Sequence, residues 1–281
     1  MYLSRPTRIA LRIATGLVLA FIYVPIVVIV VYAFNQGRTQ RWPLEGATLD
    51  WFDKAVHNPG VRDALWTSIQ AAVGATAIAL VLGTLAALAV ARFDFFGRGA
   101  VSFLVVLPLA LPGIVTGMAL NATFRQVLEP FGVQLGMFTV IVGHATFCIV
   151  VVFNNAVARL RRMSSSFEEA SADLGAQPLQ TFRLVTLPQL RSALVAGGLL
   201  AFGLSFDEVI VTTFTAGSSQ TLPLWILTNL SRPNQLPIVN VVAFFVVALS
   251  IVPVYFAHRL TTDREGDLGE AKPAAEALAV P

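Results

Sequence analysis

Two adjacent acids in a strongly apolar part of the chain have the chemistry of a cation site. Asp207 and Glu208 follow Phe206 within the run Leu204-Ser-Phe-Asp-Glu-Val-Ile-Val-Thr-Thr213. Carboxylates in such surroundings need a wet cavity, a partner or a proton, and an aromatic ring beside them adds a cation–π contact. Neighbouring residues on a helix point about 100° apart, so at most one of the two acids is expected to face a bound cation. Alternatively, the helix ends early and leaves both acids at its end, or hydrogen-bonded to a partner.

A polar stretch between two apolar runs is the second candidate site. It reads Ser164-Ser-Ser-Phe-Glu-Glu-Ala-Ser-Ala-Asp-Leu-Gly-Ala-Gln-Pro-Leu-Gln-Thr-Phe-Arg-Leu-Val-Thr-Leu-Pro188. Ser165 or Ser166 is a suitable N-cap for a helix, and Glu168 or Glu169, three residues later, would complete a capping box. We therefore expect the stretch to begin with a short capped helix.

The rest of this stretch predicts a turn and a second helix. Gly175 stands where the residue after a helix adopts a left-handed conformation, and Pro178 suits the first turn of the next helix. Pro188 is expected to close the hairpin before the following apolar run. Three apolar side chains, Phe167, Leu174 and Phe182, are expected to anchor the hairpin. A polar helical hairpin between two apolar runs has the character of a docking element.

The chain lacks the motifs of several enzyme classes. Its two lysines, Lys54 and Lys272, are followed by Ala and Pro, so it has no Gly-Lys-Ser/Thr phosphate loop. It contains neither a His-Glu-x-x-His pair nor a Gly-x-Ser-x-Gly elbow. The single cysteine, Cys148, excludes an intrachain disulfide and a cysteine metal cluster. We expect no catalytic residues, no metal and no cofactor, and any ATP would have to be hydrolysed by a partner.

Two further features concern the apolar runs. His144 could titrate or bind a solute, but a hydrogen-bonded packing histidine is favoured. The segment Pro108-Leu-Ala-Leu-Pro112-Gly113 must depart from regular helix geometry. In a membrane, irregular backbone is tolerated only beside protein or a water-filled cavity, so Pro112 and Gly113 are candidates for a transport pathway.

Composition places these features in a membrane. Hydrophobic residues make up 56% of the 281 residues and charged residues only 12%, which indicates an all-α integral membrane protein. We expect one transmembrane domain over residues 1–260 and a polar tail over 261–281. The expected spans are residues 14–34, 65–91, 101–120, 138–158, 194–214 and 237–257. The net charge of +3 comes from basic residues at the ends of apolar runs, which favours a lipid bilayer over nucleic acid as the partner.

The distribution of Lys and Arg predicts the orientation. The segments on the side of the two termini carry 13 of these residues and the opposite segments carry 6. By the positive-inside rule, both termini and the stretch from Ser164 to Pro188 are expected in the cytoplasm.

The polar stretch also carries a family resemblance. Glu169-Ala-Ser171, then three residues, Gly175, nine residues and Val185-Thr-Leu-Pro188 resembles the EAA motif of permease subunits of binding-protein-dependent ABC importers. Ser171 and Val185 depart mildly from the motif. The resemblance extends to Leu107-Pro-Leu-Ala-Leu-Pro-Gly-Ile-Val-Thr-Gly117, Val142-Gly-His-Ala-Thr-Phe147 and the run around Asp207, which look like the second permease subunit of putrescine/spermidine importers.

The resemblance implies a type I importer permease fold (MetI-like) in a bacterial inner membrane. It implies a homologous second permease, an ABC ATPase dimer and an extracytoplasmic solute-binding protein as partners, and a polyamine as solute. The implied ATPase-coupling loop comprises Glu168, Glu169, Ala170, Ser171, Gly175, Ala176, Phe182, Leu187 and Pro188.

Other functions stay open at this point. The same permease role for a different solute is the nearest alternative. An ion-coupled secondary transporter would use Asp207 or Glu208 as its coupling site, but it would have no use for an ATPase-docking loop. A purely structural assembly protein would predict no acids within the membrane.

Overall fold

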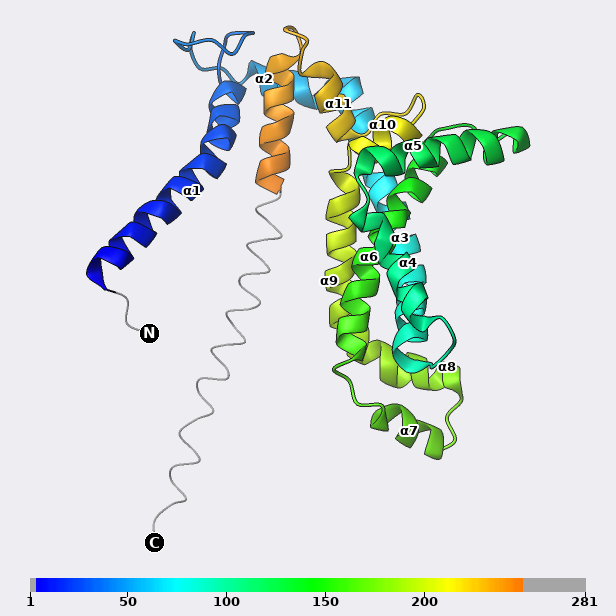
Figure 1. The fold of residues 1–281 in the computed structure, drawn as a ribbon. Helices are drawn as coiled ribbons and strands as arrows, with labels where there is room; N and C mark the ends of the chain where they lie inside the picture. Colours follow the sequence, from blue (N-terminus) through cyan, green and yellow to red (C-terminus); the bar gives the residue numbers. More distant parts are fainter. Residues whose placement is uncertain (1–3, 250–281) are drawn as a thin grey trace. The chain divides into compact units, whose positions relative to one another are not determined.

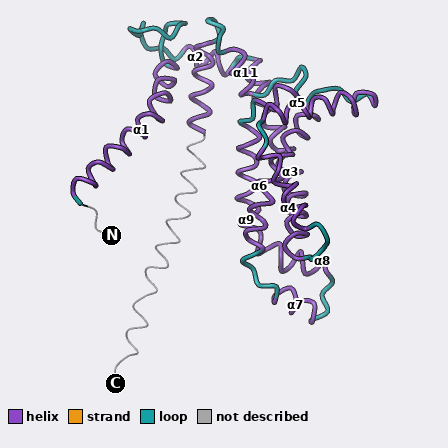
Figure 2. The backbone as a smooth tube through the Cα atoms, in the orientation of Figure 1, coloured by secondary structure: helices purple, strands orange, loops and turns teal. Residues whose placement is uncertain are grey.

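The computed structural model describes residues 4–249, and its regular structure in that range is helical (Figures 1 and 2). The chain divides into two compact units, one made of residues 1–58 and 228–281 and the other of residues 59–227. The predicted tail at 261–281 and the last part of the expected span 237–257 lie outside the described residues.

The first unit contains the N-terminal helix α1 (Arg5–Ala33), the short helix α2 (Asp50–Val56) and a helix over Leu236–Leu249. Ser4 caps α1, and its hydroxyl accepts a hydrogen bond from the backbone N–H of Thr7. A cluster of aromatic rings packs these segments together, comprising Phe34, Phe52, Phe244 and Phe245. Apolar side chains are exposed over most of α1, as expected for a helix that lies against lipid or another subunit.

Three long helices form the core of the second unit: α3 (Pro59–Arg92), α6 (Met137–Leu160) and α9 (Leu187–Phe206), which lie side by side in Figure 1. The buried residues of the first of them are small. They are Ala64, Ser68, Ala71, Ala72, Ala75, Ala79, Gly83, Thr84, Ala87 and Val90. Small side chains let helix backbones approach closely, which is how helices associate in a membrane.

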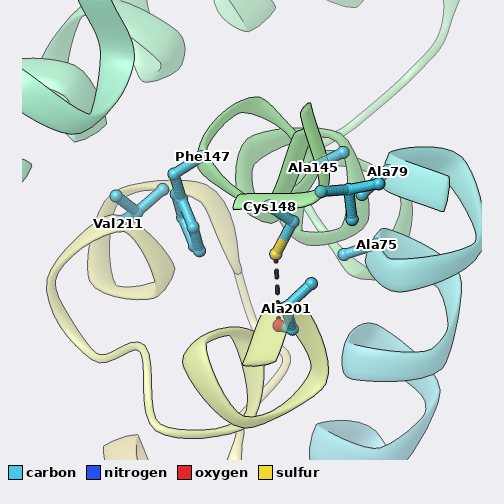
Figure 3. Packing of buried hydrophobic residues seen from close by; sticks show 8 residues of the cluster. Ala75, Ala79, Ala145, Phe147, Cys148, Ala201 and Val211 are labelled. Carbon is cyan, nitrogen blue, oxygen red and sulfur yellow. Dashed lines mark hydrogen bonds between the residues drawn. The ribbon is translucent and has the colours of Figure 1, made fainter. Parts of the chain in front are cut away.

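Figure 3 shows one part of this core. Ala75 and Ala79 of α3 face Ala145 and Cys148 of α6, and Ala201 of α9 completes the contact. The Cys148 thiol donates a hydrogen bond to the Ala201 carbonyl oxygen, with 3.3 Å between Sγ and O. Cys148 therefore serves as a small packing residue, as its place in an apolar run suggests.

The expected span over residues 101–120 is broken in two. Helix α4 (Arg98–Ala110) ends before Leu111 and Pro112, which have extended backbone conformations, and α5 (Gly113–Thr123) begins directly after them. The segments Arg98–Ala110 and Gly113–Phe131 are bent by 106°. The predicted irregularity is confirmed, and it lies at Leu111 because a residue that precedes a proline is disfavoured in helical geometry.

The remaining elements are short. A π-helical turn (Phe124–Leu128) and a 3₁₀ turn (Glu129–Phe131) follow α5. The loop between α6 and α9 contains α7 (Ser166–Asp173), α8 (Pro178–Thr181) and a π-helical turn (Phe182–Thr186). Helices α10 (Ile210–Thr215) and α11 (Leu222–Asn229) follow α9.

Four described helices are long and apolar enough to cross a bilayer, and the bent pair makes a fifth if it counts as one span. They correspond to the predicted spans 14–34, 65–91, 101–120, 138–158 and 194–214, with shifted ends. The described part of the expected span 237–257 is the helix Leu236–Leu249.

Candidate functional site

The hairpin predicted between Ser164 and Pro188 is present at one end of the helical core (Figure 1). Gly175 has a φ angle of +83°, the left-handed conformation that the sequence predicts. Apart from its two chain neighbours, no described residue comes within 4 Å of where its Cβ would be, so backbone geometry rather than crowding favours glycine there. Pro178 occupies the first turn of α8. Both of these local predictions are confirmed.

The predicted capping box is wrong. Ser165 is the N-cap of α7, but its backbone is helical and its side chain makes no capping hydrogen bond. The Ser164 hydroxyl instead accepts a hydrogen bond from the N–H of Ser166, with an N–O distance of 3.2 Å. Glu168 is unavailable for a capping box because other parts of the chain bind its carboxylate.

That carboxylate is the centre of a polar cluster. Its Oε2 lies 2.9 Å from Nε of Arg92, the last residue of α3, and its Oε1 accepts a hydrogen bond of 2.9 Å from the Thr186 hydroxyl. Nη1 of Arg92 donates to the carbonyl oxygen of Leu160, the last residue of α6, over 3.4 Å. We call Arg92, Glu168, Thr186 and the Leu160 carbonyl the ion-pair cluster. Sequence reasoning missed Arg92, which no motif marks.

The outer side of the hairpin has a different character. Glu169, Ala170 and Gly175 are exposed, whereas Ala176 and Phe182 are half-buried. Four large apolar side chains of the hairpin are also exposed: Phe167, Leu174, Leu179 and Leu184. Within the described residues, Phe167 and Leu174 stay open, because 58% and 90% of their surfaces are accessible, so the expected anchoring of the hairpin by these side chains would be against a partner. Ser171 instead ties α7 to α8, with its Oγ 3.0 Å from Oγ1 of Thr181.

Pro188 does not close the hairpin. The helix is continuous from Pro178 to Phe206, and the π-helical turn Phe182–Thr186 lies immediately before Leu187 and Pro188. Proline lacks an N–H and its ring crowds the carbonyl of the preceding turn, so one wider turn lets the helix continue through it. This region is therefore the start of α9. Leu187 also lines an apolar groove of about 750 Å³ between α3 and α9, together with Leu80, Leu194, Val195, Leu199 and Phe202.

At its other end, α9 stops earlier than predicted. It ends at Phe206, and Asp207, Glu208 and Val209 separate it from α10. A continuous span over residues 194–214 is thus wrong, and the alternative of an early helix end is correct. Asp207 is exposed, whereas Glu208 is half-buried and its Oε1 accepts a hydrogen bond of 2.9 Å from the N–H of Val211. Glu208 thereby satisfies an orphan donor in the first turn of α10.

A second polar cluster holds this helix break against α6. His144 is fully buried, with Nδ1 2.8 Å from the hydroxyl oxygen of Ser205 and Nε2 2.8 Å from that of Thr212. The Thr212 hydroxyl donates to the Glu208 carbonyl oxygen over 2.6 Å. Because the Thr212 hydroxyl already donates its proton, it can only accept from His144. All these hydrogen bonds form when Nε2–H of His144 donates to Thr212 and Nδ1 accepts from Ser205. We call these residues the histidine cluster, and it has the packing role that the sequence favours for His144.

The helices that follow the two breaks, α5 and α10, are in contact. Helix α5 packs on α10, with Gly117 so close to Phe214 that an added Cβ would lie 2.6 Å from the ring. Gly113 faces Ile210 in the same contact, and Asn121 donates a hydrogen bond to the carbonyl oxygen of Phe214. Helices α5 and α10 therefore form one packed pair. Pro112 and Gly113 stand at the start of α5, and Asp207 lies in the break before α10.

The family profile of binding-protein-dependent transport system inner membrane components matches residues 79–264. This range contains both polar clusters and the hairpin, and it covers more than half of the chain. The chain belongs to this family. It is therefore an inner-membrane transport component, with several membrane-crossing helices, and the resemblance drawn from the hairpin spacing is confirmed.

Individual relatives agree with this assignment. The putrescine transport system permease protein PotI of Escherichia coli is 31% identical over 261 residues, covering 90% of this chain and 92% of its own. The spermidine/putrescine transport system permease protein PotC of Haemophilus influenzae is 33% identical over 246 residues, covering 87% and 93%. These relatives are permease subunits, so this member of the family is a transport subunit and not an enzyme.

A solved structure shows the same fold. A chain of a bacterial ABC transporter involved in the import of the acidic polysaccharide alginate superimposes with a TM-score of 0.68 at 20% identity, covering 94% of this chain and 99% of its own. The predicted ABC importer permease fold is thereby confirmed. Within residues 4–249, no group of three or more His, Cys, Asp and Glu could hold a metal ion.

Proposed function

We propose that this chain is one of two homologous permease subunits of an ABC importer, working with two ATPase subunits and an extracytoplasmic solute-binding protein. The observation that supports this proposal most strongly is the 31–33% identity of the chain, over about 90% of its length, to permeases of polyamine transport systems. In this proposal the chain has six spans, and the excess of Lys and Arg puts both termini in the cytoplasm.

The hairpin is the proposed ATPase-docking site. Its exposed Glu169 and Ala170, the left-handed Gly175 and the four exposed apolar side chains defined above form a surface that residues 4–249 leave uncovered. Exposed apolar groups gathered on one surface are typical of a protein interface. The proposed coupling residues are the nine implied by the family motif: Glu168, Glu169, Ala170, Ser171, Gly175, Ala176, Phe182, Leu187 and Pro188.

The apolar groove between α3 and α9 supports the second permease as a partner. Its walls are almost entirely apolar, with Leu80, Leu194 and Phe202 among them, and Arg191 at its edge. A matching helix of a homologous permease would bury this surface within the bilayer.

The proposed solute is a polyamine such as putrescine or spermidine. Asp207 is the acid that we propose lines the pathway, because it is exposed at a helix break, with Phe206 beside it. Glu208 is the weaker candidate for the pathway, because its carboxylate accepts a hydrogen bond from the first turn of α10. Pro112 and Gly113 stand at the facing break and complete the proposed pathway.

Uptake into proteoliposomes tests this function. The full importer, reconstituted with ATP inside and the loaded binding protein outside, should accumulate labelled putrescine or spermidine, and unlabelled polyamine should compete. Competition by a different solute class alone would keep the permease role and reject the polyamine. Uptake that follows an ion gradient without ATP would favour a secondary transporter instead.

The same assay tests Asp207. Replacing Asp207 by Asn removes the charge and keeps the shape, so uptake of the cationic solute should fall about tenfold in a normally assembled complex. Glu208→Gln is the matched control, because a Gln oxygen can still accept from Val211 N–H, and its uptake should stay close to wild type. Equal uptake by Asp207→Asn and wild type would remove Asp207 from the pathway.

A further inference from the structure

The ion-pair cluster joins four parts of the chain at one point. Glu168 belongs to α7, Arg92 to the end of α3, Leu160 to the end of α6, and Thr186 to the turn that begins α9. The two charged side chains are mostly buried, with 17% of Arg92 and 21% of Glu168 accessible. By contrast, the Arg98–Asp94 ion pair and the His57–Asp53 contact each join residues one helical turn apart.

The charges in this cluster suit the helix ends where they stand. Arg92 is at the C-terminal end of α3 and binds a C-terminal carbonyl of α6, while Glu168 is in the first turn of α7. Helix dipoles favour a cation at the C-terminal ends of α3 and α6, and an anion at the N-terminal end of α7. Nε and Nη2 of Arg92 are buried without a hydrogen bond, so the nearby carboxylate acts mainly by its charge.

Helix α7 is joined to the core by non-helical segments, unlike α8, which is continuous with α9. Non-helical residues 161–165 connect α7 to α6, and residues 174–177 connect it to α8. Adjacent residues on α7 point about 100° apart, so Glu168 faces the core while Glu169 stays exposed. The two neighbouring acids therefore have different surroundings, one bound within the chain and one open to a partner.

The core end next to Arg92 is firmly packed. Seven buried side chains of α3, α6 and α9 form one cluster there: Ala87, Val90, Phe153, Ala156, Val157, Leu160 and Leu190. A displacement of Glu168 acts on Arg92 and hence on this packed group, because close-packed interiors move as units rather than deform.

We propose that Arg92 is a positioning residue for transport: it links α7 directly to the membrane helices, so that movement of the hairpin reaches α3, α6 and α9 together. This inference rests on the proposed docking of an ATPase at the hairpin. It assigns a role to a residue outside the motif, and it separates Glu168, which faces inward, from Glu169, which is left for the partner.

The experiment measures solute transported per ATP hydrolysed by the reconstituted importer. Arg92→Gln and Glu168→Gln should each lower this ratio about tenfold. Arg92→Gln, which lies outside the proposed docking residues, should retain ATP hydrolysis and assembly with the ATPases. The double variant should lose no more than either single variant, because both remove the same link. Arg92→Lys should recover much of the ratio, since it keeps the charge. Additive losses, or a wild-type ratio in Arg92→Gln, would overturn the proposal.

Control variants separate the possible failures. Arg98→Gln breaks the exposed ion pair with Asp94, in which 39% of the Arg98 side chain and 96% of the Asp94 side chain are accessible. This change should leave the amount of solute transported per ATP unchanged. If Arg92→Gln does not assemble, Glu168→Asp and Thr186→Val, which weaken the link without removing the cation, carry the same test. A wild-type complex without ATP-dependent uptake would refute the proposed function itself, whereas normal wild-type uptake with a normal ratio in the variants would refute only this inference.

Discussion

The two ends of α9 are held by polar clusters of different chemistry. At its start, the ion-pair cluster joins opposite charges that keep about a fifth of their surface in contact with solvent. At its end, the histidine cluster joins an imidazole to two hydroxyl groups, and His144, Ser205 and Thr212 are at most 2% accessible. One cluster secures a loop to a helical core, and the other secures a break within the core.

This difference follows from what each environment tolerates. A fully buried site inside a membrane protein favours neutral groups with complete hydrogen bonding, because an unpaired charge there is very costly. A site at the end of the helices can keep a charged pair, since solvent and helix dipoles reduce the cost of burial. We infer that the histidine cluster contributes more to stability, whereas the ion-pair cluster is better suited to respond to a partner.

The largest expected effect is that of His144→Leu. The change removes two hydrogen bonds and leaves the Ser205 and Thr212 hydroxyls buried with one partner fewer, so the free energy of unfolding should fall by about 3 kcal/mol. Unfolding of the purified subunit in detergent measures it.

His57→Leu is the control for this change. His57 bonds within α2 and its side chain is 73% accessible, so its loss should cost less than about 0.5 kcal/mol. Equal effects of the two substitutions would mean that the histidine cluster does not stabilise the helix break.

A smaller effect on the free energy of unfolding is expected when each cluster loses one hydroxyl group. Ser205→Ala leaves Nδ1 of fully buried His144 without its donor and should cost about 1–2 kcal/mol. Thr186→Val removes one donor from a carboxylate that keeps Arg92 and some solvent contact, so it should cost about 0.5 kcal/mol. Measured in the same unfolding assay, the reverse order would contradict the comparison.

The sequence predicts these clusters to different degrees. Gly175 and Pro178 identify the hairpin because their backbone preferences are local, and the prolines near Pro112 identify the first break for the same reason. The break at Asp207 is predicted only as an alternative, because the apolar run continues through it without Pro or Gly. Its signal was the pair of acids itself, which is more easily placed at a helix end than inside a span.

The contacts of each cluster could not be predicted. Glu168 and Glu169 are adjacent and chemically alike, so only the position of Arg92 determines which of them faces inward. The continuation of the helix through Pro188 depends on the π-helical turn before it, which has no simple residue pattern. These features depend on tertiary contacts between segments far apart in the chain.

The smallest expected effect concerns salt. Raising the ionic strength from 0.1 to 1 M shortens the Debye length from about 10 to about 3 Å, which weakens partly exposed charge pairs and leaves buried neutral hydrogen bonds nearly unchanged. The destabilisation caused by Glu168→Gln should therefore shrink by about 0.3 kcal/mol in high salt, because the wild-type ion pair it is compared with is itself weakened. The destabilisation caused by His144→Leu should stay constant, and using it as the reference removes the general effect of salt on the detergent-bound protein. If both differences change equally, the two clusters do not differ in exposure to solvent in the way that their accessible surfaces indicate.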